Sequence, residues 1–252
     1  MTIAVITGAS SGLGREYVQQ TVAQLPNVDE IWLIARRTDR LQAIADEYPN
    51  RKFRLLSLDL MKTESFENYR QALAEANADV RLLINSAGFG KLGNFAEEDT
   101  ATQIGMVDLN CRALTAMTNI TLPYMSKGSG ILNVSSIASF APTPRMAVYC
   151  STKAYVSSLS HALAEELRPL GIHVLAVCPG PMATEFLDVA DITGHSKTFQ
   201  TLPYCRPAAV AKTSLARLLK GKRWYTNRGF YKFYRVLCKL LPFRFIMKLS
   251  KT

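Results

Sequence analysis

Six short apolar runs along the chain are separated by longer stretches in which apolar and polar positions alternate with helical spacing. The runs predict buried strands at Ile3–Ile6, Ile31–Ala35, Phe53–Leu58, Val80–Ile84, Ile131–Val134 and Ile172–Val177. The longer stretches predict helices at Glu16–Leu25, Asp39–Tyr48, Glu64–Ala76, Thr102–Met125, Tyr149–Leu167 and Pro207–Lys220. Because alternating strands and helices form βαβ units, the pattern indicates an α/β fold with a parallel sheet.

Local signals indicate where these elements end and how the chain is divided. Thr63 stands where its hydroxyl can cap the third predicted helix, and Pro207 fits the first turn of the sixth. No linker rich in Pro, Gly or Ser interrupts the alternation, so we expect one domain over residues 1–252. The stretch 178–207 is long and irregular, and such loops in compact domains usually carry function.

Composition and charge narrow the class of protein. Hydrophobic residues make up 48% of the chain and charged residues 20%, which is typical of a globular protein. No signal peptide and no apolar run of membrane-spanning length is visible, so we expect a cytoplasmic protein. The five cysteines form no CxxC pair and have no nearby histidine, which favours reduced thiols and no metal site.

The net charge of +10 is unevenly distributed. Residues 192–252 contain 14 Lys and Arg and no Asp or Glu, whereas the rest of the chain has 16 basic and 20 acidic residues. A nucleic-acid partner would need base-reading or stacking elements in the basic region, and no known motif is visible there. We therefore expect no nucleic-acid binding.

A glycine-rich segment, TGASSGLG at residues 7–14, follows the first predicted strand and opens a helix. Glycine lets the backbone turn tightly and approach a pyrophosphate, whose charge then meets the helix N-terminus. Gly and Ser also occur in plain turns, but the strand before and the helix after are the context that a dinucleotide site requires. The segment therefore predicts a dinucleotide cofactor.

The end of the second predicted strand indicates which cofactor binds. An acidic side chain at this tip would bind both ribose hydroxyls and repel a 2′-phosphate, but Ala35 stands there, followed by Arg36 and Arg37. Guanidinium groups can hold a phosphate by paired hydrogen bonds. The alternative is a pair of solvated arginines on the surface. We expect NADP(H) in preference to NAD(H).

Several motifs in a fixed order resemble the short-chain dehydrogenase/reductase family in its compact, single-domain branch. They are the TGxxxGxG spacing, Asn85-Ser86-Ala87-Gly88, the Tyr149–Lys153 pair with Ser136 13 residues before the tyrosine, and Pro179-Gly180 followed by Thr184. Ser86 departs from the family's second asparagine. The resemblance implies a Rossmann-type doubly wound parallel sheet of about seven strands with helices on both faces. It also implies hydride transfer between a nicotinamide and a carbonyl or alcohol carbon.

The resemblance assigns roles to four residues. Tyr149 would be the acid or base, Ser136 would hold the substrate oxygen, Lys153 would hold the nicotinamide ribose, and Asn110 would kink its helix and support a proton relay through water. Tyr149 and Lys153 are four residues apart and so share a helix face. Because a free phenol has a pKa of about 10, we expect the Lys153 ammonium to lower the pKa of Tyr149.

The glycine-rich segment, the arginines after the second strand and the family resemblance together imply a set of residues that bind the dinucleotide. They are Gly8, Ser10, Ser11, Gly12, Leu13, Gly14, Arg36, Arg37, Asp59, Leu60, Asn85, Ala87, Gly88, Tyr149, Lys153, Pro179, Gly180, Met182 and Thr184.

Residues 222–252 form a basic, apolar extension at the end of the chain. Residues 230–241 read FYKFYRVLCKLL, which places Lys232, Arg235 and Lys239 along one stripe of an aromatic helix, and a second basic and apolar piece follows at 243–251. Such a helix can lie in a membrane interface, pack over the mouth of a substrate pocket or form an oligomer contact. The sequence leaves these alternatives open.

Two functions remain as hypotheses. The first is an NADP-dependent oxidoreductase that acts on a small carbonyl or alcohol, with an apolar substrate, a homodimer or homotetramer, and peripheral membrane contact through residues 222–252. The second is a non-catalytic NADP-binding protein with a regulatory or membrane-docking role. The fold alone does not separate them.

Overall fold

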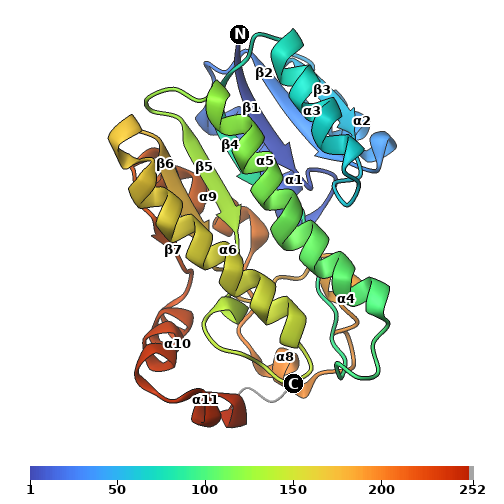
Figure 1. Ribbon diagram of the computed structural model, residues 1–252, viewed down its shortest axis with the longest axis vertical. Helices are drawn as coiled ribbons and strands as arrows, with labels where there is room; N and C mark the ends of the chain where they lie inside the picture. The colour runs from blue at the N-terminus through green and yellow to red at the C-terminus, as the bar shows by residue number, and fades with distance from the viewer. Residues whose placement is uncertain (250–252) are drawn as a thin grey trace.

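The computed structural model describes residues 1–249, in which seven strands form one parallel sheet. The strand order is β3-β2-β1-β4-β5-β6-β7, and every neighbouring pair is parallel. The predicted doubly wound, Rossmann-type fold is confirmed (Figure 1). The strands are β1 Thr2–Thr7, β2 Glu30–Ala35, β3 Phe53–Ser57, β4 Asp79–Asn85, β5 Gly130–Val134, β6 His173–Val177 and β7 Trp224–Tyr225.

Helices cover both faces of the sheet and bury a separate apolar core on each side (Figure 1). Side chains at helical spacing on α1, α2 and α9 build the first core, and those on α3, α5 and α6 build the second. The bounds are α1 Gly12–Gln24, α2 Thr38–Asp46 and α9 Pro207–Leu219 for the first layer, and α3 Glu64–Glu75, α5 Leu114–Thr121 and α6 Ala147–Glu166 for the second.

The long helix expected over Thr102–Met125 is interrupted by a π-helical turn. It consists of α4 Thr100–Val107, the π-helix η1 Asp108–Ala113, α5 and a short 3₁₀ turn. Asp99 caps α4 by accepting hydrogen bonds from two backbone N–H groups. A π turn inserts an extra residue and often marks a functional site.

Thr63 occupies the predicted N-cap position of α3 but its hydroxyl does not cap the helix, whereas the proline at the start of α9 is confirmed. Thr63 has helical backbone angles and its side chain makes no cap hydrogen bond. The chain already turns from residue 59 onward, because the Lys62 and Ser65 amides donate to carbonyls three residues earlier. The Thr63 hydroxyl accepts a hydrogen bond from Arg112 instead.

The carboxyl ends of all seven strands point to one edge of the sheet, where the chain reverses its strand order between β1 and β4. Loops that follow β1, β4, β5 and β6 therefore meet at this edge, which is where open α/β sheets bind ligands. The irregular stretch 178–207 lies here and contains two short helices, α7 Phe186–Val189 and α8 Lys197–Thr201.

The end of the chain folds back beneath the same edge as two helices, α10 Gly229–Leu240 and α11 Phe243–Leu249 (Figure 1). The helix predicted at 230–241 is thus confirmed, and the basic, apolar piece that follows it forms α11; the last part of that piece, 250–251, lies outside the described residues. Ile246 is buried and belongs to a small core with Ala141 and Cys238. No described helix has both the length and the apolar character that a bilayer crossing needs.

Candidate active site

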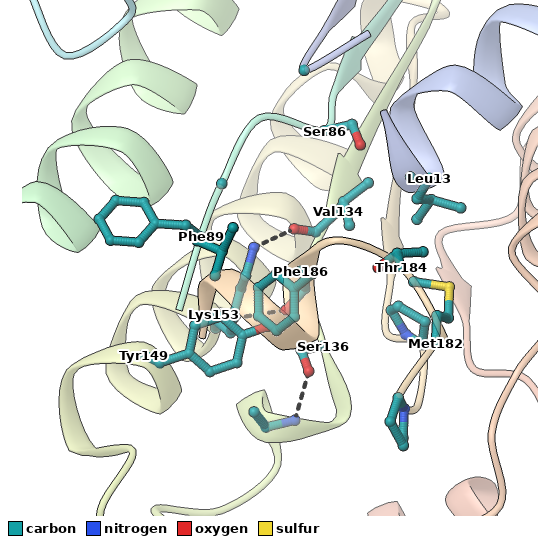
Figure 2. Close-up of a pocket in the computed structure, with 18 of the residues that line it drawn as sticks. Leu13, Ser86, Phe89, Val134, Ser136, Tyr149, Lys153, Met182, Thr184 and Phe186 are labelled. Carbon is teal, nitrogen blue, oxygen red and sulfur yellow. Dashed lines mark hydrogen bonds between the residues drawn. The ribbon is translucent and has the colours of Figure 1, made fainter. Parts of the chain in front are cut away.

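A cavity of about 770 Å³ opens at the carboxyl edge of the sheet. Its walls come from the glycine-rich loop after β1, the loops after β4, β5 and β6, the start of α6, and the inner side of α10. One end is therefore formed by backbone and small residues, and the other by apolar side chains. Figure 2 shows the region between these two ends.

The backbone of the glycine-rich loop approaches neighbouring backbone so closely that two of its positions have no room for a side chain. A Cβ at Gly8 would lie 2.8 Å from the backbone of Ala87, and one at Gly14 would lie 2.0 Å from the carbonyl oxygen of Gly8. Gly8 and Gly12 also have positive φ angles, 67° and 52°, a backbone conformation that L side chains rarely adopt. The loop is thus a cradle that holds its backbone against the neighbouring loop.

The first turn of α1 opens toward this cradle. Ser11 occupies its N-cap position but makes no cap hydrogen bond with its side chain, because the Ser11 hydroxyl accepts from Arg37 instead. The first backbone N–H groups of α1 are therefore left for an anion, and the helix dipole favours one there. Ser10, Ser11, Gly12 and Leu13 all line the cavity, as the sequence predicts.

Arg37 lies across the outer end of the cradle. Its guanidinium donates to the Ser10 and Ser11 hydroxyls, at 3.1 and 2.9 Å, and to the Glu185 carboxylate at 3.0 Å. Arg40 also donates to Glu185, and these two arginines hold the pKa of that carboxyl below its usual value. Arg36 is exposed and lines the same end. Sequence reasoning missed Glu185, which lies far away along the chain.

Two side chains, those of Thr7 and Asn85, fix the start of the loop after β4. The Thr7 hydroxyl accepts hydrogen bonds from the backbone N–H groups of Ser86 and Ala87, both at 3.1 Å. Asn85 points away from the cavity, since its amide donates to Thr118 and to Asn133 in the core. Asn85 thus does not line the cavity; it ties β4 to α5 and β5.

The remaining sequence-predicted cofactor residues line the walls between these loops and the centre. Gly180 makes the closest approach, because a Cβ there would lie 2.2 Å from the ring of Tyr231 on α10. The others that line the cavity are Asp59, Leu60, Ala87, Gly88, Pro179, Met182 and Thr184.

Ser136, Tyr149 and Lys153 come together at the centre of the cavity (Figure 2). The Tyr149 hydroxyl lies beside the Ser136 side chain, which acts to lower its pKa, and Tyr149 is only 7% exposed. The Lys153 ammonium donates to the carbonyl oxygen of Val134 at 2.9 Å and lies 5.8 Å from the centre of the Tyr149 ring. The structure brings these three predicted residues into one group.

Burial and hydrogen bonding separate the two neighbouring serines at the end of β5. Ser135 is 2% exposed, and its hydroxyl donates to the Lys153 carbonyl oxygen at 2.8 Å and contacts the Ser157 hydroxyl. Ser136 is half-buried and faces the cavity, where its hydroxyl accepts from the Ala138 N–H. Ser135 therefore holds the framework, and Ser136 is the serine beside Tyr149.

The protonation of the two central groups differs from the sequence expectation. Burial raises the pKa of Tyr149 above its ordinary value, so the predicted lowering is wrong for this arrangement. Burial also lowers the pKa of Lys153 to about 8. The ammonium lies beside the ring and is held by Val134, and desolvation of the phenolate outweighs the other influences on Tyr149. At neutral pH Tyr149 is a neutral phenol that can donate a proton.

Asn110 is buried in the π-helical turn and does not line the cavity. Its amide donates to the Phe89 carbonyl oxygen and to the Thr152 hydroxyl, and its side-chain oxygen accepts from the Phe89 N–H. A Cβ at Gly88 would lie 2.7 Å from that oxygen and 3.4 Å from the Lys153 ammonium. Asn110 is thus a positioning residue that fixes the loop beside Lys153.

Comparison with known families decides the class to which this arrangement belongs. The family model described as short chain dehydrogenase matches residues 2–192. The chain belongs to the short-chain dehydrogenase/reductase family. The match covers the glycine loop, the central group and the loop after β6, whereas α9, α10 and α11 lie beyond it.

Relatives within this family carry several names. The chain is 32% identical to sulfoacetaldehyde reductase 2 of Chromohalobacter salexigens, over 73% of this chain and 74% of that protein. It is 28% identical to a very-long-chain 3-oxoacyl-CoA reductase of Emericella nidulans, over 85% of this chain and 61% of that protein. Among solved structures, a short-chain dehydrogenase from Sphingobium yanoikuyae in complex with NADPH has a TM-score of 0.79 and 26% identity, over 96% and 97% of the two chains.

The apolar end of the cavity in this short-chain dehydrogenase comes largely from the irregular stretch 178–207 and the C-terminal extension, the two segments to which the sequence pointed. It is built by side chains from 178–207, from the start of α6 and from α10, which meet only in the folded chain. Phe186 lies 5.5 Å from Tyr149, measured between ring centres. The aromatic run at 230–234, for which packing over the pocket mouth was one of the alternatives, lines this wall. The wall residues include Met146, Leu187, Phe199, Leu202, Phe230, Phe233, Tyr234 and Leu237.

Proposed function

We propose that this protein interconverts a carbonyl and an alcohol on an apolar small molecule, with NADP(H) as hydride carrier and Tyr149 as acid or base. The observation that carries the proposal is the group of Ser136, Tyr149 and Lys153 at the centre of a cavity that also contains the glycine cradle. A non-catalytic protein would not need a buried phenol beside a serine hydroxyl and a buried ammonium. The catalytic hypothesis is therefore favoured over the regulatory one.

The residues of the cradle fit a dinucleotide. The uncapped first turn of α1 and the positive-φ glycines suit a pyrophosphate. Asp59, Pro179 and Thr184 line the same cavity; Asp59 would meet the adenine, and Thr184 and the loop at Pro179 would hold the nicotinamide carboxamide. When bound, the nicotinamide supplies the hydride in reduction and accepts it in oxidation.

The side chains of this protein would handle the oxygen and its proton. In reduction, negative charge develops on the substrate oxygen, and the Ser136 hydroxyl would stabilise it by donating a hydrogen bond. The neutral Tyr149 phenol would then transfer its proton to that oxygen, and the nearby Lys153 ammonium would stabilise the phenolate left behind. In oxidation the same groups work in reverse. Asn110 would keep the Phe89 loop and Lys153 in place.

Arg37 supports a preference for NADP(H) over NAD(H). Ala35 ends β2 without a carboxylate that would repel a 2′-phosphate, and Arg37 is held at the outer end of the cradle by Ser10 and Ser11. Arg36 lies exposed at the same end and can add a second positive charge. The NADPH complex of the Sphingobium yanoikuyae relative is in line with this assignment.

The charges along the cavity support an uncharged, apolar substrate. Among the described residues that line the cavity, every charged side chain lies at the nucleotide end or in the central group: Arg36, Arg37, Asp59, Lys153 and Glu185. A sulfonate such as that in the name of the Chromohalobacter salexigens relative would need a cationic partner at the far end. A ketone, aldehyde or acyl carbonyl with an apolar chain fits the aromatic wall better.

We extend the proposal to the assembly and location of the protein. Ile104 and Val107 on α4 and Tyr155 on α6 are exposed apolar side chains on helices that lie side by side, which supports a homodimer or homotetramer through this face (Figure 1). The five cysteines are all free, which is typical of a reducing compartment and supports the cytoplasm. We expect the whole chain, residues 1–252, to act as one domain.

The function can be tested by following NADPH absorbance with a panel of apolar ketones, aldehydes and acyl thioesters. We expect turnover by the parent chain and a loss of about 10²- to 10⁴-fold in kcat in Tyr149→Phe, because the proton donor is removed. NADPH binding should persist in that variant. Tyr155→Phe on the exposed side of the same helix is the matched control and should keep its activity. Tight NADPH binding without turnover of any carbonyl compound would favour the regulatory hypothesis.

A further inference from the structure

The last two helices expose a row of large apolar side chains that nothing in the described chain covers. Phe230, Phe233, Val236 and Leu240 on α10 are 53%, 66%, 52% and 76% exposed, and their spacing places them on one stripe of the helix. Phe243 and Phe245 on the neighbouring α11 are also exposed, by 53% and 60%. We call the four residues on α10 the tail face. Contiguous exposed apolar surface of this kind marks an interaction site.

The helix that carries the tail face is firmly attached on its opposite side. Tyr231 is fully buried against Gly180, and its hydroxyl donates to the Pro203 carbonyl oxygen at 2.8 Å. Cys238 and Ile246 are buried in the small core that joins α10 and α11. The orientation of α10 is therefore fixed by packing, and the apolar stripe points outward because the other side is already used.

Positive charge flanks the apolar stripe, and no negative charge balances it. Lys232 and Lys239 are exposed on the side of α10 between the apolar stripe and the buried side. The central carbon of the Arg235 guanidinium lies over the Trp224 ring, 4.1 Å from the ring centre. Arg244 and Lys248 are exposed on α11. The sequence from 192 to 252 contains no Asp or Glu. A surface of this charge pattern fits a partner that is both negatively charged and able to take up aromatic side chains.

The tail face also borders the cavity. Phe230 and Phe233 belong both to the exposed stripe and to the cavity wall, next to Tyr234 and Leu237. The apolar end of the cavity therefore opens beside the same side chains that are exposed to the outside. An apolar molecule leaving a partner at the tail face would meet apolar wall throughout its path into the cavity.

We propose that the tail face docks on an anionic lipid surface and that the cavity takes its apolar substrate from that surface. The aromatic and aliphatic stripe would enter the boundary between headgroups and acyl chains, and Lys232 and Lys239 would lie against the anionic headgroups. The docking itself is independent of the proposed function, and only the route of the substrate rests on it. An acidic carrier protein would use the lysines but would leave the phenylalanines without a role, so the lipid surface accounts for more of the face.

Binding of the full chain to vesicles tests the proposal. We expect sedimentation with vesicles of phosphatidylcholine and phosphatidylserine, weaker binding to phosphatidylcholine alone, and a loss of binding as salt is raised. Leu240→Asp places a charge at the most exposed residue of the stripe without touching the cavity wall, and should weaken binding by about tenfold or more. Phe95→Asp is the matched control, because Phe95 is also 66% exposed but lies on a distant loop, and it should bind as the parent does.

A second pair of variants separates charge at the tail face from net charge. Lys232→Glu with Lys239→Glu should abolish the preference for anionic vesicles, whereas Lys52→Glu with Lys62→Glu changes the net charge equally and should preserve it. The proposal is overturned if the parent binds no vesicles, or if Leu240→Asp binds as tightly as the parent. It is also overturned if the parent forms a concentration-dependent dimer in solution that Leu240→Asp abolishes, because a second copy would then cover the face.

Kinetics distinguish this inference from the proposed function. Leu240→Asp should reduce a water-soluble ketone at the parent's rate, but should show a higher KM for a ketone that partitions into anionic vesicles. Equal KM values for the vesicle-borne ketone would overturn the substrate route. Vesicle binding without any carbonyl turnover would leave docking intact and contradict the proposed function alone.

Discussion

At the residue scale, chemically identical side chains differ in their surroundings, and these differences select the reactive ones. Tyr149 is buried beside Ser136, whereas Tyr155 on the same helix is 42% exposed and forms a hydrogen bond with Thr115. Their positions along the chain hint at the distinction only through the resemblance to a family. Burial supplies the physical reason for the proposed role of Tyr149, because a phenol shielded from water keeps its proton and would release it only to a strong base such as a developing alkoxide.

The buried ammonium of Lys153 predicts a pH dependence. The pKa of Lys153 is lowered to about 8, so the charged form prevails below that pH and is lost above it. We expect kcat/KM for NADPH to fall as the pH rises through this value, since the ammonium would no longer hold the ribose or support Tyr149. Lys153→Arg should keep its charge and remove this fall, although its absolute rate would be lower. A profile for the parent that stays flat well above this pH would contradict the role of Lys153.

At the element scale, the sequence pattern predicted the six longer strands and the main helices but not the features that depend on contacts between distant segments. The two residues of β7 pair with Ala176 and Val177 only after α9 has carried the chain back to the sheet edge. The π turn at Asn110 is stabilised by hydrogen bonds to the Phe89 backbone, which no local pattern reveals. The residues expected in the centre and in most of the nucleotide end line the cavity; Asn85 and Asn110 do not, because their amides are used inside the core.

The ion pairs that connect α2 to the segment before α7 predict how two variants change cofactor affinity. Arg37→Met should weaken NADP(H) binding by about 1.5–3 kcal/mol, as expected for one charged contact, and leave NAD(H) binding nearly unchanged. Glu185→Gln should have the opposite effect, because its carboxylate competes with a 2′-phosphate for Arg37 and Arg40.

Titration of both cofactors by fluorescence measures these affinities. Glu75→Gln is the control for removing a surface carboxylate paired with an arginine, and should change neither affinity. If Glu185→Gln weakened NADP(H) binding, the carboxylate would be holding Arg37 in its binding position and the competition would be refuted.

At the scale of the whole molecule, a close contact links the terminal helices to the loop after β6. Gly180 follows β6 and lines the cavity, and Tyr231 of α10 fills the space that a side chain at 180 would need. The loop that would hold the nicotinamide is thus also the loop against which α10 packs. Changes at this contact should therefore affect both the stability of the tail and the shape of the apolar wall.

Gly180→Ala tests this dependence. The added methyl group would lie 2.2 Å from the Tyr231 ring, so α10 must shift. We expect a loss of about 1–3 kcal/mol in the free energy of unfolding, as in other overpacked cores, together with a higher KM for apolar substrates and faster proteolysis within the last two helices. Gly229→Ala at the start of α10 meets no atom within 4 Å and should behave as the parent. Unchanged proteolysis and KM in Gly180→Ala would show that the contact between Gly180 and Tyr231 tolerates the larger residue.

The separation of charge along the chain has a consequence for how the molecule approaches a charged surface. Residues 192–252 contribute 14 positive and no negative side chains, while the remainder has 16 positive and 20 negative, and the terminal helices lie at the opposite end of the molecule from the N-terminus (Figure 1). Lys232, Lys239, Arg244 and Lys248 are exposed on these helices, so the molecule would have an electric dipole whose positive end lies there. In the field of a negatively charged boundary it would rotate before contact, within a distance of about 10 Å at ordinary ionic strength. The first collision would then already present the cavity mouth, so that productive encounters need little random search.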